Sequence, residues 1–84
     1  MSLNMIREKV LSALTEIAPE VDPVSLNPDL PIRDQVDFDS VDLLNFVVAL
    51  EEMFEVTVPE RDYPQIATIG GMVEYLASRA GTTT

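Results

Sequence analysis

Cysteine and histidine are absent from this sequence, and basic residues are few. The 84 residues contain 5 Lys+Arg against 15 Asp+Glu, so the formal net charge is −10. Without cysteine there is no disulfide framework, thiolate metal site or cysteine nucleophile. Without histidine, the commonest general base and the commonest metal ligand are both missing. We therefore expect neither a catalytic site nor a metal site, and do not expect an enzyme.

Long hydrophobic runs are absent as well. No stretch approaches the ~18–20 apolar residues of a membrane span, so stable membrane insertion is not expected. The start of the chain lacks the charged and apolar regions of a secretory signal, which together with the absence of cysteine favours the cytoplasm. The negative charge excludes nucleic acid and anionic membranes as good partners, and it favours basic protein surfaces.

The length is that of a single domain. Hydrophobic residues make up 46% of the chain, too many for a disordered acidic tail. We expect one domain over residues 1–84, with residues 1–4 as an expression scar or frayed start and residues 81–84 as a frayed tail.

Proline and apolar spacing divide the first half of the chain. Residues 3–18 are predicted to form a helix with Asn4 as its cap and Pro19 at its end. Residues 19–39 contain four prolines and form a long connection, which we expect to pack on the core with a short turn near residues 33–36. The inward face of the first helix consists of Ile6, Val10, Ala13, Leu14 and Ile17.

Two further main helices are predicted after this connection. One spans residues 40–55 and is capped by Asp39 or Ser40, and a short helix then follows from Pro59 to residue 66. Thr68 caps the last helix, whose first turn we expect to fray because it holds a Gly pair at 70–71. Its apolar stripe consists of Ile69, Met72, Val73, Leu76 and Ala80. The fold class is therefore all-α, a small bundle of three main helices and one short helix.

The helix over residues 40–55 carries two apolar stripes. The stripe assigned to the core consists of Leu43, Phe46, Val47, Leu50, Met53 and Phe54. The second consists of Val41, Leu44 and Val48. This second stripe either packs under the long loop or faces solvent as a partner-binding strip. Nine acidic residues and one basic residue lie between positions 34 and 62, which favours binding to a basic partner.

Catalytic and metal motifs fail on inspection. A calcium loop starting at Asp37 would need a Gly at position 42 and a Glu at position 48, where Asp and Val stand. Ser40 lacks the histidine and the Gly-x-Ser-x-Gly elbow of a hydrolase nucleophile. Taken alone, Ser40 is interpreted as a helix cap.

One ordered set of motifs changes that interpretation. Asp-Ser-Val-Asp at residues 39–42 opens a hydrophobic helix, which ends in Glu51-Glu52 and Phe54. Val58-Pro59 and Thr68-Ile69 follow. This pattern resembles the acyl carrier protein family from about residue 5 to residue 80.

The resemblance implies a covalent cofactor and a set of partners. A phosphopantetheinyl transferase would attach 4′-phosphopantetheine from coenzyme A to Ser40, next to the motif residue Asp39. The arm would carry acyl groups as thioesters to lipid, fatty-acid or polyketide-type biosynthetic enzymes, and the chain is expected to be a monomer. Acyl-loading and acyl-processing enzymes would dock through basic patches. The implied partner-binding residues are Val41, Asp42, Leu44, Val48, Glu51, Glu52 and Glu55.

Departures from the family pattern indicate a specialised member. Phe38 stands where the family often has a small residue, and it is expected to shield the arm or alter docking. Asn45 removes one docking charge, and Tyr63-Pro64 makes the short helix unusual. Two alternatives remain, an unmodified acidic adaptor that binds a basic partner through the helix starting at Ser40, and an aminoacyl or D-alanyl carrier.

Overall fold

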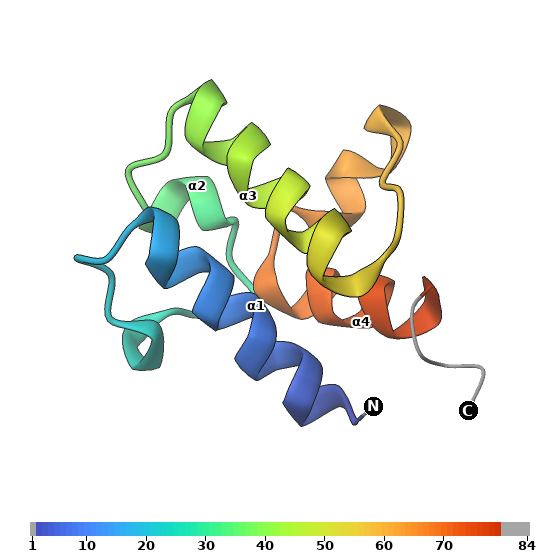
Figure 1. Ribbon diagram of the computed structural model, residues 1–84. Coiled ribbons are helices and arrows are strands. Elements are labelled where there is room, and N and C mark those ends of the chain that lie inside the picture. Colours follow the sequence, from blue (N-terminus) through green and yellow to red (C-terminus); the bar gives the residue numbers. More distant parts are fainter. Residues whose placement is uncertain (1, 80–84) are drawn as a thin grey trace.

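Helices account for all the regular structure in the described part of the chain. The structure is a computed structural model that describes residues 2–79 (Figure 1). The long helices are α1 (Leu3–Ile17), α3 (Ser40–Phe54) and α4 (Ile69–Arg79). The shorter ones are η1 (Pro23–Ser25), α2 (Ile32–Gln35) and η2 (Glu60–Ile66), of which η1 and η2 are 3₁₀ helices. The predicted all-α bundle is confirmed, and η1 is an addition to it.

The first helix begins earlier than its predicted cap. The Ser2 hydroxyl accepts the backbone N–H of Met5 at 3.2 Å, so Ser2 is the cap and Asn4 lies inside the helix. The predicted cap was Asn4, and that prediction was wrong. Residues 2–4 are thus part of the capped start of α1, and the tail expected at residues 81–84 lies outside the described residues.

The core lies where α1 packs against both α3 and α4, and η2 packs against α4. Figure 1 shows η2 leading from the end of α3 back towards α4. The fully buried large side chains come from every long helix and from α2: Ile6, Val10, Leu14, Ile32, Phe46, Val47, Leu50, Ile69, Met72 and Leu76. These residues confirm most of the predicted inward stripes. Met53 is an exception because it is partly exposed, and Ala80 lies outside the described residues.

Two side chains, Phe38 and Met53, differ in burial from what the sequence indicated. Phe38 is only 7% exposed and packs edge-to-face on Phe46, with ring centroids 5.9 Å apart. It is part of the core, and the expectation that it shields the arm or alters docking stays a prediction. Met53 is 39% exposed, so its assignment to the core stripe was wrong; at 100° per residue it lies at the edge of that stripe.

The long connection packs on the core as predicted. The amide of Gln35 ties it together, accepting the N–H of Asn27 at 2.7 Å and donating to the carbonyls of Asn27 and Leu30. The turn expected near residues 33–36 is α2. A single bridge between Pro31 and Thr68 joins this connection to the start of α4.

The glycine pair at the start of α4 allows close packing rather than fraying. The N–H of Gly70 donates to the carbonyl of Pro28 at 2.9 Å, and the N–H of Gly71 donates to the Thr68 hydroxyl at 2.9 Å. A Cβ on Gly71 would lie 2.5 Å from the carbonyl oxygen of Gln65. This turn is hydrogen-bonded to the loop at Pro28 and to its own cap, so the expectation that it frays was wrong, while Thr68 is confirmed as the cap.

Candidate functional site

Asp39 caps α3 and leaves Ser40 as its first residue. The Asp39 carboxylate accepts the N–H of Asp42 at 2.8 Å, and the Asp42 carboxylate accepts the N–H of Asp39 at 3.5 Å. This reciprocal pair is a capping box. The sequence did not decide whether Asp39 or Ser40 caps this helix, and the structure shows that Asp39 does. The interpretation of Ser40 as a cap is therefore wrong.

Ser40 is consequently an exposed hydroxyl at the positive end of a long helix. The backbone N–H groups of Ser40 and Val41 have no acceptor within the helix, because the first turn of any α-helix lacks a preceding turn. Such N–H groups and the helix dipole favour an anionic group at this position. The site can accept a phosphoester on Ser40 without disrupting the cap.

The second apolar stripe of α3 faces solvent. Val41 is 63% exposed, Leu44 is 53% exposed and Val48 is 41% exposed. The long loop does not cover them, so the interpretation that they pack beneath it is excluded. They form an exposed apolar strip that runs along α3 from the residue after Ser40.

The acidic residues beside this strip divide into two kinds. Glu52 and Glu55 are exposed, and Glu55 ends the helix in the left-handed conformation with φ 54°. Glu51 is half-buried, and its carboxylate accepts the N–H of Val58 at 2.8 Å. Asp42 takes part in the capping box. Two of the predicted docking carboxylates therefore also hold the backbone, which the sequence pattern did not indicate.

Asp62 does not belong to this acidic surface. It is 8% exposed, and its carboxylate accepts the Tyr75 hydroxyl at 2.7 Å and an Arg79 N–H at 3.4 Å. Burial, followed by the hydrogen bond to Asp62, raises the pKa of Tyr75 above its usual 10.0. The Arg79 guanidinium also stacks 4.7 Å from the centre of the Tyr75 ring. This cluster joins η2 to α4. Its only local indication in the sequence was the spacing of Tyr75 and Arg79, which lie one helical turn apart and can therefore contact each other.

An apolar hollow of about 300 Å³ opens beside the site. Leu43 and Val47 form its α3 wall, and Leu43 lies one helical turn from Ser40. The remaining lining comes from α2 and η2 with their flanking residues, namely Pro31, Ile32, Arg33, Tyr63, Pro64, Ile66 and Ala67. The unusual Tyr63-Pro64 pair thus forms part of a wall of this hollow.

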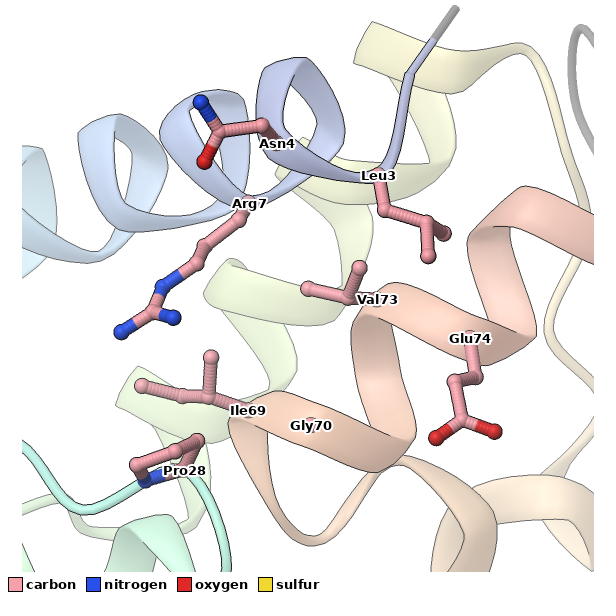
Figure 2. Close-up of a pocket in the computed structure, with 8 residues that line it drawn as sticks. All are labelled: Leu3, Asn4, Arg7, Pro28, Ile69, Gly70, Val73 and Glu74. Atoms are coloured by element: carbon pink, nitrogen blue, oxygen red, sulfur yellow. The ribbon is translucent and has the colours of Figure 1, made fainter.

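A second hollow, of about 390 Å³, lies between α1 and α4. Figure 2 shows Leu3 and Arg7 of α1 facing Ile69 and Val73 of α4 across it. None of its lining residues belongs to α3, whereas the first hollow is lined by Leu43, one helical turn from Ser40. Of the two hollows, the one that Leu43 and Val47 line therefore has a wall on the helix that begins at Ser40.

Within residues 2–79, none of the helices combines the length and the apolar character that crossing a membrane requires.

Comparison with known proteins agrees with this geometry. The family described as "Phosphopantetheine attachment site" matches residues 8–76. Acyl carrier protein from Acidothermus cellulolyticus is 33% identical over 79 residues, covering 90% of this chain and 94% of that protein. Acyl carrier protein from Renibacterium salmoninarum is 34% identical over 74 residues, covering 84% of this chain and 91% of that protein. The solved acyl carrier protein from Enterococcus faecalis has a TM-score of 0.70 at 28% identity, covering 88% of this chain and 98% of that one.

Fold, exposed serine and family match together define a small helical carrier rather than an enzyme. The chain belongs to the acyl carrier protein family. Its prosthetic group is therefore a covalently attached 4′-phosphopantetheine, and its general partners are a phosphopantetheinyl transferase and acyl-processing enzymes. The residues fit this group, because an exposed hydroxyl stands beside unpaired helix N–H groups and an apolar hollow.

Proposed function

We propose that Ser40 carries the phosphopantetheine arm and that the arm carries acyl groups as thioesters. The observation that supports this most directly is the division of roles at the start of α3. Asp39 caps the helix, and the neighbouring Ser40 hydroxyl stays exposed for modification. When bound, the arm supplies a terminal thiol, which a chain without cysteine cannot provide itself.

The chain's own residues have three tasks in this function. Ser40 provides the attachment oxygen, with Asp39 keeping the helix start in place. Leu43 and Val47 offer an apolar wall against which an acyl chain can lie away from water. The exposed strip and its carboxylates present the site to other proteins.

Docking is assigned to the face of α3 that begins at Ser40. Its apolar contacts are Val41, Leu44 and Val48, and its acidic contacts are Asp42, Glu51, Glu52 and Glu55. An apolar strip among carboxylates complements a partner that has an apolar groove and a basic rim. We assign the chain to the cytoplasm as a single, monomeric carrier domain that serves lipid, fatty-acid or polyketide-type biosynthesis.

Intact mass spectrometry tests the attachment. The protein is incubated with coenzyme A, Mg²⁺ and a broad-specificity phosphopantetheinyl transferase, with Ser40→Ala as the matched variant. We expect one phosphopantetheine mass on the wild type and none on Ser40→Ala. Modification of Ser40→Ala would place the site elsewhere, and no modification of either protein by several transferases would favour the unmodified adaptor.

A further inference from the structure

Burial alternates along the segment that leads from α2 into Ser40 (Figure 1). Val36 is 3% exposed and Phe38 is 7% exposed, whereas Asp37 and Asp39 are exposed. This is the alternation of an extended chain, in which successive side chains point to opposite sides. The two buried side chains therefore attach the backbone to the core immediately before the proposed attachment site.

Hydrogen bonds among residues 2–79 do not provide a second attachment for this stretch. Those of residues 37–39 reach no further than Val36 on one side and Leu43 on the other. Phe38 donates its N–H to the carbonyl of Val36 at 2.8 Å, and the remaining bonds belong to the capping box and the first turn of α3. The packing of the Phe38 side chain is therefore what fixes this stretch relative to the bundle.

Phe38 stands directly before the residue that caps α3. An apolar side chain at this position often packs against the first turns of the helix, which fixes the angle at which the chain enters it. Phe38 makes a contact of this kind deeper in the helix, edge-to-face with the fully buried Phe46 and with ring centroids 5.9 Å apart. The angle at which the chain enters α3 thus depends on Phe38, and Ser40 is the first residue of that helix.

Attachment of the arm requires a particular direction of the Ser40 hydroxyl. The Ser40 oxygen attacks the phosphorus of coenzyme A that bears the pantetheine group. The bond from Ser40 Oγ to phosphorus forms and the bond from phosphorus to the bridging oxygen breaks. Adenosine 3′,5′-bisphosphate leaves with the electron pair, and the hydroxyl proton passes to solvent. The attacking and leaving oxygens lie roughly in line, and a misplacement of about 1 Å can lower such a rate by about a hundredfold.

We propose that Phe38 is a positioning residue for this transfer. By packing on Phe46 it holds the entry angle of α3, and with it the direction from which the Ser40 hydroxyl attacks. Because the ring is only 7% exposed, it acts through the backbone that leads into Ser40 and not by contact with the transferase. This inference rests on the proposed attachment at Ser40.

Single-turnover transfer separates positioning from docking. The protein is mixed with an excess of transferase at a series of concentrations, with saturating coenzyme A and Mg²⁺, and the gain of the arm is followed by intact mass. The limiting rate reports the transfer step, and the transferase concentration that gives half of it reports docking. Phe54→Ala is the matched control for Phe38→Ala, because Phe54 is also a buried phenylalanine, 6% exposed, and lies at the other end of α3.

We expect Phe38→Ala to lower the limiting rate by about tenfold or more and to leave the half-saturating transferase concentration within about twofold of the wild-type value. Phe54→Ala should retain the wild-type limiting rate. Leu44→Ala, on the exposed strip, should raise the half-saturating concentration and leave the limiting rate unchanged. Thermal melts verify that each variant is folded at the assay temperature. If the alanine variants are not folded, Phe38→Leu and Phe54→Leu take their place, with the same order of rates expected.

An unchanged limiting rate in the folded Phe38 variant would overturn the positioning role. An equal loss of rate in the Phe54 variant would attribute the effect to general destabilisation, and a raised half-saturating concentration alone would assign Phe38 to docking. Either result would also overturn the proposal. Failure of the wild type to gain any arm would instead refute the proposed function, and the mass of the wild type alone distinguishes that result.

Discussion

Removing the Tyr75 hydroxyl should destabilise the protein more than the loss of a single oxygen atom suggests. Tyr75→Phe deletes the donor that lies 2.7 Å from the Asp62 carboxylate. Asp62 is 8% exposed, and its remaining side-chain donors, Gln65 and Arg79, are each 3.4 Å away. A hydrogen bond to a charged group contributes about 1.5–3 kcal/mol, and a poorly compensated buried carboxylate adds to the loss. We expect the free energy of unfolding to fall by about 2 kcal/mol.

Thermal melting followed by circular dichroism measures this loss. For a domain of this size, 1 kcal/mol shifts Tm by about 4–8 °C, so Tyr75→Phe should melt about 8–16 °C below the wild type. Tyr63→Phe is the matched control, since Tyr63 is half-buried and no hydrogen bond found among residues 2–79 involves its hydroxyl. Its change should stay within about 0.5 kcal/mol. Equal melting of Tyr75→Phe and the wild type would refute the assignment of Asp62 and Tyr75 as the fastening of η2.

Four further outcomes are expected. Because the pKa of Tyr75 is raised in the folded state, the unfolded chain loses the hydroxyl proton first as the pH rises. The free energy of unfolding should therefore fall above about pH 10, by up to about 1.4 kcal/mol per pH unit. Melts of Tyr75→Phe at a series of pH values should lack this fall. Gly71→Ala should lower stability by about 1–3 kcal/mol in urea titrations despite the better helix propensity of alanine, because its Cβ meets a backbone carbonyl at 2.5 Å; a stabilised variant would contradict this. Glu51→Lys should lower both Tm and the affinity for the transferase, because it also removes the acceptor of the Val58 N–H. Glu52→Lys, at an exposed position, should lower the affinity alone. Thermal melts measure the first effect and binding titrations with the transferase measure the second. Added salt should raise the wild-type Tm by screening repulsion among the acidic residues, and a Tm indifferent to salt would argue that they are already well separated.

The helices were predictable because each long one repeats its apolar residues at helical spacing, although of the three caps only Thr68 was assigned correctly from sequence. The exposed strip on α3 was predictable in part, since a helix that already has one core-facing stripe has no need of a second. Sequence could not decide whether the long loop covers that strip, because a loop has no periodicity that fixes its path. The exposures of Val41 and Leu44 decide it.

Residues outside periodic segments were the hardest to place. Phe38 stands in irregular backbone, where nothing in the local pattern says which way a side chain points, and the edge-to-face contact with Phe46 comes from tertiary packing. Asp62 and Tyr75 are 13 residues apart and belong to different elements, so their hydrogen bond has no local signature. The bond from Val58 to Glu51 depends in the same way on how the chain turns after α3.

The two ends of α3 explain how one helix can hold the fold together and still leave the proposed docking surface exposed. At its start, Asp39 and Asp42 satisfy each other's backbone, which leaves Ser40 and the exposed strip available. At its end, Glu51 binds the backbone of the following turn, while Glu52 remains exposed. A charge reversal at Asp42 or Glu51 is therefore expected to lower both the folded fraction and the affinity for a docking partner. The docking contribution of this face is measured cleanly only at Glu52 and Glu55, and binding losses at the other two positions must first be corrected for stability.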